Sequence, residues 1–117
     1  MLSEDLSFTE FQLAASDVAV YPEVGTGSMM AIAYCALGLG EAGEVQGKVK
    51  KIFRDNDGIV TEEAKTALMG EIGDVLWYCA SLASELGVSL EQIAQGNIDK
   101  LKDRAARGVL QGSGDNR

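Results

Sequence analysis

Apolar residues recur at intervals of three and four along almost the whole chain, and nowhere do they alternate as they would in a β-strand. This periodicity is typical of amphipathic helices. Capping patterns and glycines divide it into four predicted helices: 8–19, 29–54, 61–86 and 89–107. We therefore predict one all-α domain over residues 1–117, in which residues 109–117 form a polar tail that is mobile when nothing is bound.

The two longest predicted helices are joined by Asp55-Asn56-Asp57-Gly58, whose residue types favour a chain reversal. We expect them to pack as a long antiparallel hairpin within a four-helix, bundle-like protomer. Four helices of this size leave one apolar face of the hairpin poorly covered. This predicts a homo-oligomer.

The 117 residues include no histidine and two cysteines, Cys35 and Cys79. The missing histidine excludes Ser-His-Asp and Cys-His nucleophiles, His-ligated zinc and Glu-x-x-His di-iron centres. Any chemistry must rest on carboxylates, lysine, arginine, amides and a bound metal ion. Both cysteines lie inside helical patterns, which favours buried free thiols in a reducing cytoplasm over a disulfide.

The net charge of −8 argues against general binding to nucleic acid or to an anionic membrane. The acidic N-terminus lacks the apolar run of a secretory signal, and the longest uncharged stretch is interrupted by glycines. We therefore expect a cytoplasmic protein. A small phosphorylated ligand is compatible with the charge if cations offset it locally.

Two acidic pairs, Glu41/Glu44 and Glu71/Asp74, lie within apolar helix stripes rather than on the opposite faces. Glu44 precedes the start of the turn by 11 residues, and Glu71 follows Ile59, the first residue after the turn, by 12. At about 1.5 Å per residue both stand about 16–18 Å from the turn. In an antiparallel hairpin all four carboxylates are therefore expected to converge at one level.

Four converging carboxylates would repel one another, and a divalent cation relieves that repulsion. Ligation by oxygen alone suits Mg²⁺ or Mn²⁺. A solvated acidic face that shares this register by chance is the alternative. The pairs are surrounded by six glycines, each of which weakens a helix interior and indicates room for a ligand or close helix packing. They are Gly38, Gly40, Gly43, Gly47, Gly70 and Gly73.

The segments 40–44 (GEAGE) and 70–78 (GEIGDVLWY) resemble the E-x-x-E … E-x-x-D signature of MazG-like nucleotide pyrophosphohydrolases, members of the all-α NTP pyrophosphatase superfamily. The likeness includes Phe11-Gln12, Tyr21-Pro22 and the segment 97–104, and so covers nearly the whole chain. It implies Mg²⁺-dependent hydrolysis of a nucleoside or deoxynucleoside triphosphate to a monophosphate and pyrophosphate, with Mn²⁺ as a substitute metal. It also implies a dimer or tetramer whose site includes residues of a neighbouring chain.

The resemblance assigns the metal ligands to Glu41, Glu44, Glu71 and Asp74. This chain has Gly40 where the family signature often has a further glutamate. The residue that orients the attacking water is therefore left open between Glu41 and Glu44.

Candidate substrate-binding residues follow from residue type and helix face. Asn97, Lys100 and Arg104 share one face of the last helix and offer an amide and two cations to phosphates, although a solvated face is the alternative. Lys48 lies one turn beyond Glu44, where an ion pair with Glu44 explains it equally well.

Recognition of the base is assigned to polar and aromatic side chains. Gln12 is a polar residue in an apolar sector and is suited to hydrogen bonding with a base. Trp77 or Tyr78 is suited to stacking on one, with a core position as the alternative for Trp77. The tail resembles the ending of some phage-type members of the family, which makes Asp115 and Arg117 candidates to close over a ligand, with a frayed terminus as the alternative.

Two other functions stay open at this stage. One is a non-catalytic helical oligomerisation or regulatory module that binds metal or nucleotide. The other is a related phosphohydrolase that releases a different product.

Overall fold

The computed structural model describes residues 5–112, which form five α-helices, one short 3₁₀-helix and no strand. The all-α prediction is confirmed. The tail residues Asp115 and Arg117 lie outside the described residues. In chain order the elements are α1 (Phe8–Asp17), α2 (Met29–Gly38), η1 (Leu39–Glu41), α3 (Ala42–Asp55), α4 (Glu62–Glu85) and α5 (Leu90–Ala106).

Four of the helices begin at a side-chain cap. The hydroxyl oxygens of the cap residues accept a hydrogen bond from a backbone amide three residues on, which satisfies an otherwise unpaired donor. At the starts of α1 and α5 the bond is reciprocated by Glu10 and Gln92, which completes a capping box at each start. The caps are Ser7, Ser28, Thr61 and Ser89.

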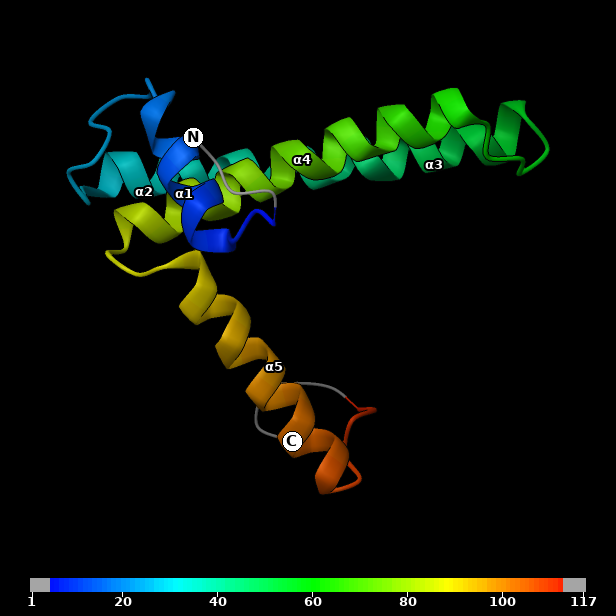
Figure 1. Ribbon diagram of the computed structural model, residues 1–117. Helices are drawn as coiled ribbons and strands as arrows, with labels where there is room; N and C mark the ends of the chain where they lie inside the picture. The colour runs from blue at the N-terminus through cyan, green and yellow to red at the C-terminus, as the bar shows by residue number, and fades with distance from the viewer. Residues whose placement is uncertain (1–4, 113–117) are drawn as a thin grey trace.

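The predicted hairpin is present, with α2, η1 and α3 forming one arm and α4 the other (Figure 1). The first arm was expected to be one helix over 29–54, and this expectation is wrong. The chain tightens into a 3₁₀ turn at Leu39–Glu41, where the Leu39 amide bonds to the carbonyl of Ala36. Glycines at 38 and 40 weaken the α-helix at this point.

The first helix also ends earlier than predicted, at Asp17 rather than at residue 19. The following loop is drawn into the protein by Glu85, a buried residue in the last turn of α4. Its carboxylate accepts hydrogen bonds from the Tyr21 hydroxyl and from the amides of Gly25 and Gly27, at 2.8 and 2.9 Å for the amides. The carboxylate therefore ties the α1–α2 loop to the end of α4.

The buried core of the chain is small. It is built mainly from small residues at the open end of the hairpin, the end farthest from its turn. Ala31 and Cys35 of α2 pack with Tyr21, while Ala15, Ala80 and Leu90 form a second cluster. Cys35 and Cys79 are free thiols, as expected, although only Cys35 is buried and Cys79 is partly buried.

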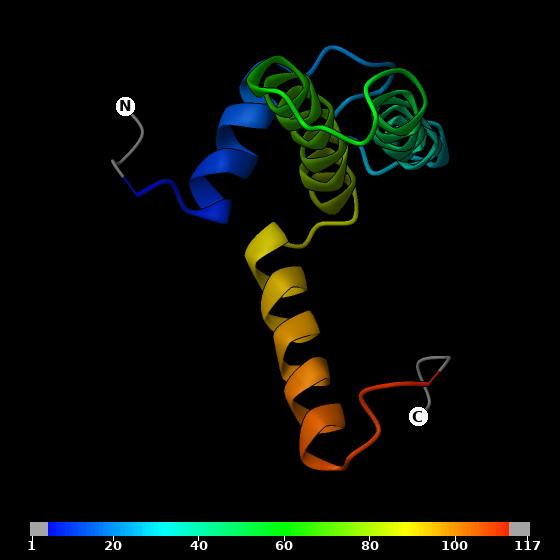
Figure 2. The same cartoon turned by 90° about the vertical axis from the view of Figure 1, so that its right-hand side faces the viewer.

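Helix α5 does not lie along the hairpin. It contacts α1 and α4 where it begins and then diverges from both arms, as Figures 1 and 2 show from two directions. The radius of gyration is 17.1 Å, against about 13 Å for a compact domain of this length. A single chain therefore does not close into the four-helix bundle that we expected.

Large apolar side chains consequently remain on the outside of the protomer. Leu37 is 81% exposed and Phe53 74% exposed, on α2 and α3. Met69 and Ile72 are exposed on α4, and Ile98 on α5. The expected uncovered apolar surface is thus present on both hairpin arms and on α5.

A membrane-spanning helix is absent from residues 5–112, because no helix there combines sufficient length with sufficient hydropathy.

The Glu85 contacts generate a stability prediction. Burial alone would raise the pKa of Glu85, but the hydrogen bonds from Tyr21, Gly25 and Gly27 outweigh it and hold that pKa below its ordinary value. Glu85→Gln places an NH₂ donor against these donors and should lower the free energy of unfolding at pH 7 by about 1–3 kcal/mol. Urea unfolding at fixed protein concentration measures this, with the exposed Glu62→Gln as the matched control.

The contribution of Glu85 to the free energy of unfolding should also depend on pH. The native pKa of Glu85 lies below the unfolded value of about 4.3. Its contribution is therefore complete above pH 4.3 and is lost as the pH falls through the native pKa. The difference in the free energy of unfolding between the wild type and Glu85→Gln should be largest at pH 7 and should shrink as the pH falls toward 3. Equal stabilities at pH 7 would contradict this role of Glu85.

Candidate metal centre

Three carboxylates from the two hairpin arms meet beside the break in the first arm. Glu41 comes from η1, and Glu71 and Asp74 come from one turn of α4. One oxygen of each lies within 4.8 Å of the others. Glu41 and Glu71 are partly buried and Asp74 is exposed. We call these three residues the acidic cluster, and their oxygens suit a hard divalent cation such as Mg²⁺ or Mn²⁺.

Glu44 is the predicted ligand that the structure does not bring into the cluster. It lies in the first turn of α3 and is exposed. The assignment of Glu44 as a metal ligand, which the family resemblance implies, therefore stays a prediction.

A lysine adjoins the acidic cluster. The Nζ atom of Lys48 lies 3.6 Å from an Oε atom of Glu71, across the two arms. The ion pair that we considered for Lys48, with Glu44, is thus replaced by one with Glu71. Because Lys48 is 37% exposed, this pair is screened by solvent and contributes little to stability. Its ammonium does offset part of the charge of the cluster.

Aromatic rings line the other side of the acidic cluster. A cavity of about 270 Å³ is bounded by Glu41, Asp74, Trp77 and Tyr78. The ring centroids of Trp77 and Tyr78 are 5.2 Å apart in an edge-on arrangement. Burial raises the pKa of the Tyr78 hydroxyl, and the charges near it, including Glu41 and Asp74, act in the same direction. We call this space the aromatic cavity.

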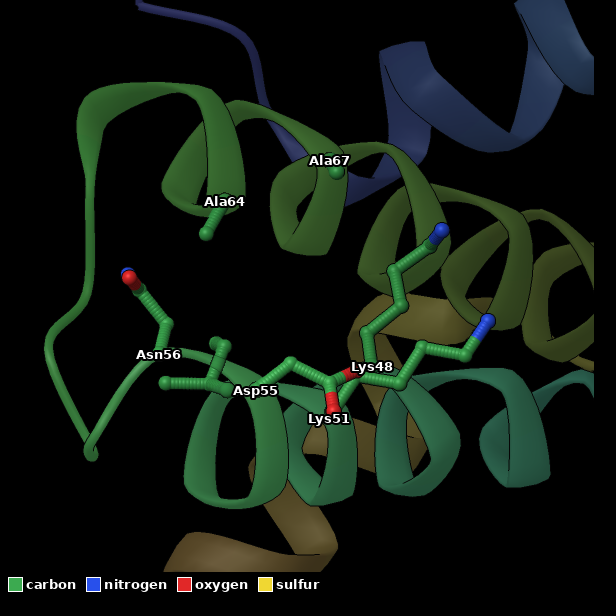
Figure 3. A pocket seen from close by; sticks show the side chains of 7 residues that line it. Lys48, Lys51, Asp55, Asn56, Ala64 and Ala67 are labelled. Atoms are coloured by element: carbon green, nitrogen blue, oxygen red, sulfur yellow. The ribbon is translucent and has the colours of Figure 1, made fainter.

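A second hollow lies between the arms, closer to the hairpin turn (Figure 3). Its volume is about 240 Å³, and Ala64 and Ala67 of α4 present only methyl groups to it. Lys48 and Lys51 line it from α3, and Asn56 lines it from the turn. Sequence reasoning missed this hollow, although the paired alanines opposite two lysines are the signal that could have indicated it. Lys48 connects the hollow to the acidic cluster.

Gln12 bridges α1 to the connection between α4 and α5. Its amide nitrogen donates to the Ser84 hydroxyl and the Val88 carbonyl, both at 3.0 Å, and its oxygen accepts from the Leu90 amide at 2.9 Å. These bonds explain a polar residue in the apolar sector of α1 by a structural role. Trp77 is partly buried and packs against both core clusters, so it serves the core and the aromatic cavity together.

The three candidates on α5 are placed apart from the acidic cluster. Asn97 and Lys100 are exposed and Arg104 is buried, all on the part of α5 that leads away from the hairpin (Figure 2). One chain therefore does not bring this face of α5 to its own acidic cluster.

Comparison with known proteins identifies a family for the chain. The family model of the MazG nucleotide pyrophosphohydrolase domain matches residues 32–109, which include η1, α3, α4, α5 and most of α2. The chain belongs to the MazG nucleotide pyrophosphohydrolase family. The match contains every residue of the acidic cluster and the α5 candidates, while α1 lies outside it.

A phage protein is also similar to this MazG-family chain. It is the Gene 37 protein of Mycobacterium phage L5, which is 52% identical over 109 residues, or 92% of this chain and 96% of the phage protein. No solved structure matches the chain.

The acidic cluster predicts cation binding that can be measured without turnover. Mg²⁺ at about one hundred times its dissociation constant should raise the free energy of unfolding by about 2.7 kcal/mol, because it binds the folded state. Glu71→Gln and Asp74→Asn should lose most of this gain, since each removes one anionic ligand. Thermal unfolding with and without Mg²⁺ measures it, and Glu62→Gln is the control that should keep the gain. A gain that survives both cluster substitutions would place the cation elsewhere.

Proposed function

We propose that this protein hydrolyses nucleoside or deoxynucleoside triphosphates to the monophosphate and pyrophosphate in a Mg²⁺-dependent reaction, with Mn²⁺ as a substitute. The observation that carries the proposal is the acidic cluster, formed by the segments that resemble the family signature. Glu41, Glu71 and Asp74 would hold the metal. When bound, the metal would neutralise charge on the phosphates and lower the pKa of a coordinated water.

The chain's own residues would position the substrate and the water. Glu44 lies one turn beyond Glu41 on the same arm, and either carboxylate is a candidate to orient the water. Lys48 already reaches the edge of the acidic cluster and would pair with a phosphate oxygen in place of Glu71. This exchange would keep the local charge balanced when the polyanionic substrate enters.

The nucleoside would occupy the aromatic cavity. Trp77 and Tyr78 line the same space as two members of the acidic cluster, so a stacked base would lie next to metal-bound phosphates. The cavity is slightly below the usual 300–1,000 Å³ of ligand pockets, as expected of a site that one chain only partly encloses.

A second copy of the chain would complete the site. The protomer is extended, its hairpin arms and α5 expose large apolar side chains, and α5 carries its amide and cations away from its own acidic cluster. In a homodimer or homotetramer, the exposed Asn97 and Lys100 would reach the phosphates bound at a neighbouring chain, and the buried Arg104 would stand behind them on the same face of α5. Such an assembly offsets the acidic character of each site with cations from its neighbour.

The competing function is a non-catalytic oligomeric or regulatory module that binds metal or nucleotide. Both functions use the acidic cluster, and both are affected by its removal. They differ in turnover, which the regulatory module lacks.

Incubation with each of the eight common nucleotides and Mg²⁺ tests the enzyme directly. At least one should yield its monophosphate and pyrophosphate, resolved by anion-exchange chromatography from diphosphate and inorganic phosphate. Glu71→Gln should lower kcat by about a hundredfold or more, because the metal contributes several kcal/mol. Glu62→Gln should keep the wild-type rate. Nucleotide binding without product from any of the eight would favour the regulatory module.

Mixing two inactive variants tests the shared site. Glu71→Gln and Lys100→Ala should each be deficient alone, because one lacks a metal ligand and the other a phosphate contact. If Lys100 serves the neighbouring chain, refolding equal amounts together should restore up to about a quarter of wild-type activity for a dimer, since half the assemblies are mixed and each has one intact site. Activity no higher than that of the separate variants would contradict a shared site.

A further inference from the structure

Among the glycines of the two arms, Gly38 alone faces a side chain at contact distance. A Cβ atom built there would lie 2.1 and 2.2 Å from two carbons of the Tyr78 ring. By contrast, a Cβ at Gly40, Gly43 or Gly47 of the same arm would meet nothing within 4 Å. The same is true of Gly70 and Gly73 on α4. Within one protomer, the expectation of close helix packing at these glycines is therefore met only at Gly38.

The Tyr78 ring occupies the space that a side chain at position 38 would need. It is also flanked by other rings: Trp77 stands edge-on at 5.2 Å, and Tyr34 is tilted at 6.4 Å. Tyr34 in turn stacks on Tyr21 at 5.2 Å. Any residue larger than glycine at position 38 must therefore push the Tyr78 ring from this position or separate α2 from α4.

Both of those responses would alter the candidate metal centre. Tyr78 lines the aromatic cavity together with Glu41 and Asp74. Gly38 is the last residue of α2 and directly precedes η1, the turn that carries Glu41. A displaced ring changes the shape of the cavity, and a displaced arm changes the distance between Glu41 and the α4 carboxylates.

We propose that Gly38 is a positioning residue, whose missing side chain sets the place of the Tyr78 ring and thereby the shape of the cavity that receives the nucleoside part of the substrate. The proposal rests on the proposed function for its ligand. The contact between Gly38 and Tyr78, from which the proposal is argued, does not depend on that function. Gly38 touches no substrate and acts through Tyr78.

A double-mutant cycle tests the proposal with two readouts. The variants are Gly38→Ala, Tyr78→Ala and the double variant, with Gly47→Ala as the matched glycine control on the same arm. The first readout is the emission of Trp77, the protein's one tryptophan, which lies edge-on to Tyr78. The second is KM against kcat for whichever nucleotide the wild type hydrolyses.

The expected result is a strong coupling between the two positions. Gly38→Ala should shift the Trp77 emission and raise KM by about tenfold with a smaller change in kcat, because it displaces the ring. In the Tyr78→Ala background the same substitution should leave the Trp77 emission where Tyr78→Ala alone places it. It should change KM by less than about twofold, since the ring is gone. Gly47→Ala should leave the Trp77 emission at its wild-type value, because a Cβ there meets nothing within 4 Å.

Several outcomes would overturn the proposal. Equal effects of Gly38→Ala in both backgrounds would show that Gly38 does not act through Tyr78, and no effect in either would show that the space is not needed. If Gly38→Ala does not fold, recovery of folding by the double variant supports the contact, and failure of both contradicts it. If the wild type hydrolyses no nucleotide, the proposed function fails, while the Trp77 cycle still decides whether Gly38 places the ring.

Discussion

The structure depends on holding three carboxylates of like charge together between two antiparallel helical arms. At 4.8 Å, each pair of unit charges repels by about 1 kcal/mol in water and by about 3.5 kcal/mol at an effective dielectric constant of 20. Lys48 offsets part of this charge from the opposite arm. The remaining charge is what a divalent cation would neutralise. The Glu85 contacts hold together the open end of the hairpin, which lies several helical turns away from the acidic cluster.

Sequence alone predicted those parts of the fold that are decided within a few residues. Capping hydroxyls such as Ser7 and Thr61 act on amides three residues away, and the Asn56-containing turn forms from its own residue types. The break at residues 39–41 follows the glycines at 38 and 40, which apolar periodicity does not record, and the divergence of α5 depends on contacts between distant segments. The Tyr21–Glu85 contact is of the same kind. A glutamate in the last turn of a helix is unfavourable to the helix dipole, and this was the one signal that Glu85 has a distant partner.

The residues of the candidate site also differ in how far the sequence could predict their positions. Helical periodicity and the register from the turn were sufficient to bring Glu41, Glu71 and Asp74 together. Glu44 lies outside this group and is exposed, so its part in metal binding stays a prediction. Gln12 was interpreted from its residue type, whereas its hydrogen-bond partners lie more than seventy residues away in sequence. The α5 residues are a prediction about an assembly, and the geometry of a single chain is consistent with it because α5 points away from its own acidic cluster.

Anomalous diffraction from crystals grown with Mn²⁺ and a triphosphate analogue that resists cleavage between its α- and β-phosphates tests the central claim most directly. The account predicts a manganese peak bonded to oxygens of Glu41, Glu71 and Asp74, with the analogue's phosphates on its open side. A peak at other residues, or phosphates bound away from these three carboxylates, would contradict it.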